Sequence, residues 1–393
     1  MERKLGIVRI LWLVLAVSLI GGPLWSVRRA FQYEKATHTL AVAVDSNDTS
    51  AALAALRAGA DPNTRQRSTD RPPTITQTLQ RFWQQMRDGK ARAESESYHR
   101  PPMIALAAKR NNMSIVKALL ERGAKPDAHA LFDDVTGGET ALMLSVENYN
   151  SDMVQLLMSK GADPNFNDTF ESEAPLLKAT DPAIIEMLLA KGADVHVGMK
   201  HGSYYGITPL RYLIINMVLN ETIDVQWHRR FDRCAEVLLA HGADINETKG
   251  GRTNPIADGY AATMLQYDST PIQIAAERCE PEEVRFLLAK GADPNLRDRS
   301  GRDALRCAID EGITDTIEVL LDYGVNPNRR DKDGRTPLFL AVEKGEDEPV
   351  RALIRGGANV NVRDKHGKTP LQLAIKVDNG TVEEILRAAG AER

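Results

Sequence analysis

The chain has 393 residues, of which 42% are hydrophobic and 26% charged, and its formal net charge is −4. These values are ordinary for a globular protein. The lack of a basic excess argues against nucleic acid as a general partner. The three cysteines, Cys234, Cys279 and Cys307, show neither disulfide nor metal-type spacing. We interpret all three as helix residues without a redox or ligand role.

An apolar stretch without any charge lies near the N-terminus, at residues 10–27. Its length is close to the lower limit of about 17–25 residues for a helix that spans a bilayer. Trp12 and Trp25 lie near its ends, where amphipathic rings favour the membrane interface. The sequence therefore predicts a signal anchor over residues 1–31, with one transmembrane helix, and a separate domain over residues 32–393.

A cleaved secretory signal peptide is the alternative interpretation of this stretch. Against cleavage, its exit shows no Ala-x-Ala site and runs directly into Arg28 and Arg29. Basic residues balance on the two sides of the span, so the positive-inside rule does not decide its orientation. The short N-terminal tail favours a single-pass membrane protein with the rest of the chain on the periplasmic side.

The C-terminal third contains a regular repeat. Gly291, Gly324, Gly357 and Gly390 follow one another at a constant step of 33 residues, and each ends a leucine-containing phrase. A Thr-Pro-Leu triplet, such as Thr336-Pro337-Leu338, follows two of these phrases. A fixed period of about 33 residues with this triplet is the mark of a helical solenoid. The pattern closely resembles the ankyrin repeat, which implies a turn, two antiparallel helices and a hairpin loop in each repeat.

The residues themselves support this resemblance. Thr336 and Thr369 suit the N-cap of a first helix, because their hydroxyls can accept from a free backbone N–H. The proline after each suits the first helical position. Gly324 suits the left-handed residue that ends a second helix. The family's usual histidine after Thr-Pro-Leu is absent, and other residues stand at that position: Phe339, Gln372, Gln273 and Arg211.

The whole of residues 32–393 can be divided into about nine such repeats, which predicts an all-α solenoid. Insertions interrupt it at about residues 66–100, 198–233 and 247–268. In the first insertion, four apolar residues at helical spacing form one stripe. That helix either packs over the early repeats or docks to a partner or a membrane. The stripe consists of Leu79, Phe82, Trp83 and Met86.

No motif for catalysis, phosphate binding or metal binding occurs in the sequence. His196 and His201 are loop residues and do not define a metal site. We therefore expect no enzymatic activity, no cofactor, no metal and no small-molecule substrate. The competing hypothesis is an enzyme accessory subunit or an unrecognised hydrolase that uses His201, Asp224, His228 and Asp258.

Two groups of residues are candidates for binding a partner protein. The first is an aromatic group in an otherwise aromatic-poor chain, which either anchors a partner or covers enlarged loops: Tyr204, Tyr205, Trp227, Tyr260 and Tyr267. The second is a row of basic hairpin tips, which either binds an acidic protein surface or is a solvated consensus turn: Arg297, Arg299, Arg329, Arg330, Lys332, Arg363 and Lys365. Charge reversal at Arg329 and Arg330 is expected to weaken binding without unfolding the chain.

Together these features predict a non-catalytic scaffold, tethered to a membrane through residues 10–27, that binds another protein. A signal anchor in front of such repeats resembles bacterial envelope proteins. A secreted effector with a cleaved N-terminus is the second alternative.

Overall fold

The computed structural model describes residues 29, 31–64, 74, 101–129, 139–167, 173–198, 206–219, 225–248, 269–278 and 281–392. The elements of this part of the chain are helices, and in chain order they fall into nine consecutive pairs. This order confirms the predicted all-helical repeat. The chain forms two compact units, which divide after Lys178.

The first unit contains a helix at residues 31–45 and then α2 (Thr49–Arg57), α5 (Met103–Lys109), α6 (Met113–Glu121), α7 (Ala141–Glu147), α8 (Ser151–Ser159) and α9 (Pro175–Lys178). The second unit begins with α10 (Pro182–Ala190), α11 (Pro209–Leu219), α12 (Val225–Ala240), α13 (Pro271–Arg278) and α14 (Pro281–Ala289). It continues with α15 (Ala304–Glu311), α16 (Thr314–Asp322), α17 (Pro337–Lys344), α18 (Asp347–Arg355), α19 (Pro370–Lys376) and α20 (Gly380–Ala388).

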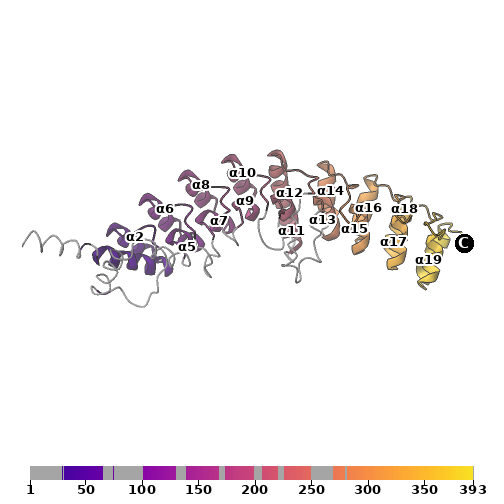
Figure 1. Cartoon of the computed structure of the whole chain (residues 1–393), viewed down its shortest axis with the longest axis horizontal. Coiled ribbons are helices and arrows are strands. Elements are labelled where there is room, and N and C mark those ends of the chain that lie inside the picture. The colour runs from indigo at the N-terminus through magenta and orange to yellow at the C-terminus, as the bar shows by residue number, and fades with distance from the viewer. Residues whose placement is uncertain are drawn as a thin grey trace, which may run out of the picture. The chain divides into compact units, whose positions relative to one another are not determined.

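Within the second unit, the first helices of successive repeats lie side by side in one layer and the second helices in another (Figure 1). α13, α15, α17 and α19 contact one another in order, as do α14, α16, α18 and α20. The core lies between these layers. Leu338, Ala341, Leu371 and Ala374 are buried there, and full burial of a leucine contributes about 1.5–3 kcal/mol.

The helix boundaries follow from capping chemistry. The hydroxyl of Thr369 accepts from the N–H of Gln372, and the Gln372 side chain accepts from the N–H of Thr369 in return. Thr336 occupies the equivalent position before α17, yet its hydroxyl is buried and forms no hydrogen bond. The prediction that both threonines occupy N-cap positions is therefore confirmed, but only Thr369 makes the capping bond.

Glycines end the second helices, as predicted. Gly324 and Gly357 have φ angles of +83° and +89°, in the left-handed region that glycine adopts without a steric penalty. The N–H of Val325 then bonds to the carbonyl of Leu320 at 3.1 Å. This bond satisfies a carbonyl at the end of α16.

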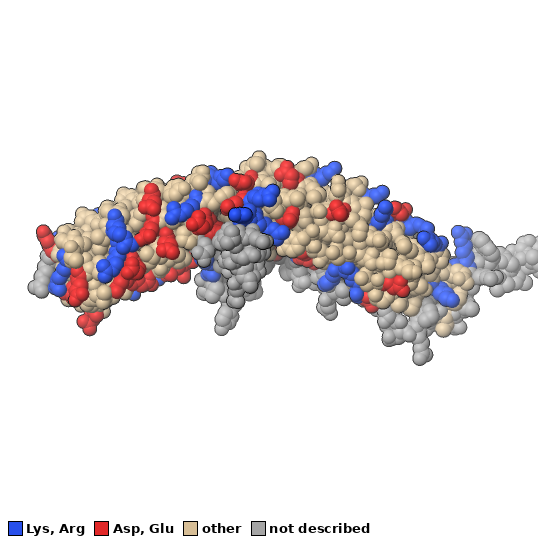
Figure 2. Space-filling model, turned by 180° about the vertical axis from the view of Figure 1, so that it is seen from behind, with Lys and Arg blue, Asp and Glu red and all other residues tan. Residues whose placement is uncertain are grey.

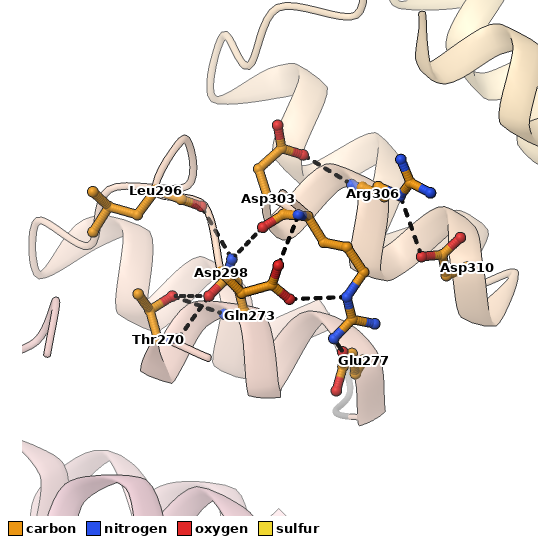
Figure 3. Close-up of polar contacts among 9 residues, drawn as sticks. Thr270, Gln273, Glu277, Leu296, Asp298, Asp303, Arg306 and Asp310 are labelled. Carbon is orange, nitrogen blue, oxygen red and sulfur yellow. Dashed lines mark hydrogen bonds and ion pairs between the residues drawn. The ribbon is translucent and has the colours of Figure 1, made fainter. Parts of the chain in front are cut away.

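A polar network replaces the histidine that the resemblance implies (Figure 3). Gln273 is fully buried. Its amide donates to the carbonyls of Leu296 and Arg302 at 3.0 and 2.7 Å, and its oxygen accepts from the N–H of Thr270 at 2.7 Å. Gln273 therefore ties α13 to the hairpin that follows α14.

Arg302 lies in the same network and forms a buried charge cluster with two carboxylates. Its guanidinium pairs with Glu277 at 2.6 Å and with Asp298 at 2.9 Å. Burial raises the pKa of Glu277, against the lowering effect of Arg302. The cluster therefore holds α13 against the hairpin through ion pairs that are largely withdrawn from water.

The predicted signal anchor at residues 1–31, the span at 10–27 and the insertion at 66–100 lie outside the described residues, apart from positions 29, 31 and 74. None of the helices that the structure describes is both long and apolar enough to cross a bilayer. Part of the predicted insertion at residues 198–233 is helical, because α11 lies within it and α12 begins at Val225. The insertion at 247–268 falls almost wholly outside the described part of the chain.

Candidate partner-binding surface

The three C-terminal hairpins share one turn built around an aspartate. Asp298, Asp331 and Asp364 occupy equivalent positions, and each accepts from the backbone N–H four residues later, at 2.8–2.9 Å. The backbone N–H of each aspartate bonds to the carbonyl of that same later residue. For Asp364, burial raises the pKa, but donation from the N–H groups of Lys368 and His366 outweighs it, so the pKa is lowered. These aspartates therefore hold the turn in shape.

The basic residues of these hairpins outnumber the acidic ones. Each of the segments 297–302, 329–335 and 363–368 carries two more Lys and Arg side chains than Asp and Glu side chains. The chain as a whole is acidic, so the excess is local to the hairpins. On the face seen in Figure 2, basic and acidic side chains stand in adjacent bands over the C-terminal repeats. An acidic surface would complement the hairpin tips.

Several of the predicted tip residues also join one hairpin to the next. The Arg329 guanidinium donates to the carbonyl of Asn295 at 2.9 Å, and the Arg330 guanidinium donates to that of Arg363 at 2.9 Å. Lys365 pairs with Asp333, and donation from this ammonium lowers the pKa of the Asp333 carboxyl. Charge reversal at Arg329 or Arg330 would therefore remove hairpin contacts as well as tip charge.

Four other predicted tip residues complete the basic row. Arg297, Arg299, Lys332 and Arg363 are exposed. The Arg363 guanidinium donates to the carbonyl of Gly367 in its own hairpin at 2.9 Å. In the part of the chain that the structure describes, Arg297 has no ion-pair partner. The structure thus shows that Arg329, Arg330 and Lys365 join one hairpin to the next, whereas Arg363 bonds within its own hairpin.

A second device links successive hairpins. A side-chain oxygen at the end of one hairpin accepts from a backbone N–H in the next, at 2.7–3.0 Å. The five acceptor–donor pairs are Asn63–Lys125, Asp127–Asp163, Asn246–Asp293, Asn328–Asn359 and Asn361–Glu392. We call this series of bonds the hairpin ladder.

The hairpin ladder is interrupted between Asn295 and Asn326, and likewise between His196 and Asp244, where the described residues supply no side-chain acceptor for the N–H of Asp244. The Asn295 amide donates to Asp293 in its own hairpin at 3.3 Å, and no side-chain oxygen of the described residues accepts from the N–H of Asn326. A shallow, open depression of about 30 Å³ lies at this step. Its charged lining residues are Arg297, Asp303, Arg306, Arg329, Asp331 and Arg335.

Arg306, Arg335 and Asn326 also line this depression, although the sequence does not predict them as part of the surface. Nothing in the sequence marks the interruption, because Asn295, Asn328 and Asn361 are the same residue at the same repeat position. Only the direction of each side-chain amide separates them.

Most of the predicted aromatic group lies outside the described residues. The four members that do so are Tyr204, Tyr205, Tyr260 and Tyr267. Trp227 falls within α12, but the structure does not describe its side chain. Phe231, from the same stretch, is buried and packs edge-on against Phe286, with ring centroids 5.7 Å apart. Phe231 therefore belongs to the core between the helices.

The residues of the competing enzyme hypothesis lie mostly outside the described part of the chain. This applies to His201, Asp224 and Asp258, and the side chain of His228 is likewise not described. Within the described ranges, no group of three or more His, Cys, Asp or Glu residues could hold a metal ion. Cys234 and Cys307 are buried, free cysteines.

Comparison with known proteins agrees with the repeat architecture. The family described as "Ankyrin repeats (3 copies)" matches residues 103–199, 233–331 and 323–392, which together make up more than half of the chain. Human Ankyrin repeat and SOCS box protein 6 is 33% identical over 244 residues, which cover 60% of this chain and 54% of that protein.

Two further relatives match shorter parts of the chain. The human mitochondrial disaggregase is 46% identical over 200 residues, or 51% of this chain and 23% of that protein. The mouse B-cell lymphoma 3 protein homolog is 32% identical over 179 residues, which cover 44% of this chain and 33% of that protein. The chain thus spans about a quarter to a half of the length of these relatives. The chain belongs to the ankyrin repeat family.

Proposed function

We propose that this chain is a non-catalytic scaffold that binds another protein through the tips of its C-terminal hairpins. The observation that carries the proposal is the repeated basic excess of three consecutive, equally built hairpins in an otherwise acidic chain. Three hairpins of the same shape and charge form a regular surface. The partner that fits it is a protein with an acidic surface.

A membrane tether through residues 10–27 is part of this proposal. Its support is the charge-free length of the segment and the tryptophans near its ends. Alkaline extraction of membranes and N-terminal sequencing test it. An anchored chain stays in the membrane fraction with its first residues intact. A mature N-terminus near residues 26–31 would instead favour the secreted alternative.

Site-specific photocrosslinking tests the binding surface in cells. A photoreactive amino acid is placed at Lys332, an exposed tip residue, and, as the matched control, at Glu384, an exposed residue of α20. The proposal predicts a discrete crosslinked protein from position 332 and none from position 384. A crosslink from the α20 position alone would place the partner on the opposite layer and contradict the proposal.

The enzyme alternative is separated by substitution of the residues it needs. Alanine at His201, Asp224, His228 and Asp258 removes every polar side chain that this hypothesis uses. The scaffold proposal predicts that the variant still gives the crosslink from position 332. If purified chain turns over a substrate and the variant does not, the scaffold proposal is wrong.

A further inference from the structure

We infer that the depression at the step from Asn295 to Asn326 of the hairpin ladder binds a carboxylate side chain, from Asp or Glu, of an acidic partner segment. This inference rests on the proposed function, because it names the part of the partner that the hairpins recognise. Three observations lead to it: an unmatched backbone donor, a guanidinium group without an ion pair among the described residues, and a precedent elsewhere in the same chain.

The unmatched donor is the N–H of Asn326. At the next two steps of the ladder, the equivalent N–H groups of Asn359 and Glu392 donate to a side-chain oxygen at 2.7 Å. At Asn326 the described residues supply no such oxygen, because Asn295 bonds within its own hairpin. Since Asn326 lines the depression, an acceptor from a partner could take the same position.

The charge around the depression favours an anionic acceptor. Four arginines and two aspartates line it. Asp303 is already engaged, because it caps α15 through the N–H of Arg306 at 3.1 Å and pairs with Arg329 at 3.6 Å. Asp331 accepts from the backbone N–H groups of Asp333 and Arg335. Two further lining arginines pair with acidic residues outside the depression, Arg306 with Asp310 at 3.6 Å and Arg335 with Glu343 at 3.0 Å. Among the described residues, Arg297 is therefore the lining arginine without an ion pair, and guanidinium groups match carboxylates in shape.

Thr336 adds a neutral polar group. It lines the depression immediately before α17, and its buried hydroxyl forms no hydrogen bond. The first turn of α17 consequently lacks the side-chain cap that Thr369 gives α19. Backbone N–H groups at the start of a helix favour negative charge.

The precedent is Asp127 in the first unit. There the acceptor in the hairpin ladder is a carboxylate, and Asp127 accepts from the N–H of Asp163 at 3.0 Å. A carboxylate is therefore compatible with the geometry of a ladder step. The depression, of about 30 Å³ and open to solvent, leaves room for a carboxylate group.

Arg297 provides the sharpest test, because Arg299 is a matched control. Both are exposed arginines of one hairpin, but only Arg297 lines the depression. The full chain is titrated with a fluorescent oligoglutamate peptide, with oligoglutamine as the neutral peptide. Glutarate and inorganic phosphate serve as competitors. Circular dichroism and thermal melting confirm that each variant is folded.

The inference predicts that Arg297→Ala weakens oligoglutamate binding by about tenfold, the loss of one charge-assisted hydrogen bond. Arg299→Ala should change the affinity for oligoglutamate by no more than about twofold, as expected for the loss of an exposed charge. Glutarate should displace the peptide at lower concentration than phosphate.

Equal losses in the two variants, or equal displacement by phosphate, would overturn the inference. In that case the crosslink from position 332 could still be present, and the proposed function would stand. If the chain that keeps Arg297 and Arg299 gives no crosslink from position 332, by contrast, the proposed function itself is wrong. The two experiments therefore fail separately.

Discussion

The Nε2 atom of Gln273 lies 2.7 Å from the carbonyl oxygen of Arg302 and donates a hydrogen bond to it. The same amide group bonds to Leu296 and Thr270. One fully buried side chain thus satisfies backbone groups on a helix and on the following hairpin (Figure 3). The glutamine makes these bonds at the position where the resemblance implies a histidine.

Replacing Gln273 with leucine should lower the free energy of unfolding by about 2–4 kcal/mol, because buried backbone groups are left without partners. Gln372→Leu is the matched control, since Gln372 is exposed and only its capping bond is lost, at about 1 kcal/mol. Urea denaturation measures both. Equal losses in the two variants would show that the buried contacts of Gln273 contribute little.

Asp127→Asn should stabilise the chain at neutral pH. Burial raises the pKa of Asp127, against the lowering effect of its bond from Asp163. The folded state therefore binds this proton more tightly than the unfolded state does. The stability that results is present below the unfolded pKa of about 4 and is lost as the pH rises through the folded value.

The asparagine side chain does not titrate, and its amide oxygen can still accept from the N–H of Asp163. The advantage of the Asp127→Asn variant should therefore be near zero below pH 4 and reach its maximum by pH 7. Urea denaturation across this range measures it. A gap between variant and parent that does not change with pH would contradict the role given to the carboxylate.

Tyr149 has a φ angle of 55°, which is unusual for a bulky residue. Asn47 and Asn111 hold the equivalent positions in the preceding repeats, with φ angles of 58° and 56°. Asparagine tolerates this conformation better. Tyr149→Asn should therefore raise the free energy of unfolding by about 1 kcal/mol. A loss of stability would show instead that the half-exposed ring makes contacts worth more than the strain.

The thiols of Cys234 and Cys307 should not react in the folded chain. Both are fully buried, and burial raises the pKa of each, for Cys234 to about 12. Because the thiolate is the reactive form, a Cys279→Ser variant should show no rapid modification by a thiol reagent until urea is added. Rapid reaction of a thiol without denaturant would contradict the interpretation of these cysteines as core residues.

The sequence predicts the repeat itself well. The positions of Gly324 and Gly357 mark where second helices end. The residue that follows such a helix is left-handed, and glycine adopts this conformation without a steric penalty. Leu338 and Leu371 mark the buried face of the first helices, since helical spacing carries that information.

The candidate binding surface is less accessible to sequence reasoning. Arg297 and Arg330 look alike in the sequence, yet Arg330 braces the next hairpin and Arg297 does not. Asn295 and Asn328 are also indistinguishable by position, although only Asn328 continues the hairpin ladder. Side-chain direction decides these differences, and a 33-residue period does not encode it.

Amide hydrogen exchange at Asn326, with and without the oligoglutamate peptide, tests the central claim most directly. The account predicts rapid exchange at Asn326 in the free chain, alongside slow exchange at Asn359. The peptide should then slow exchange at Asn326 by about tenfold or more, as expected for a newly made hydrogen bond to a charged group, and leave Asn359 unchanged. Protection of Asn326 in the free chain, or exchange there that the peptide does not alter, would contradict it.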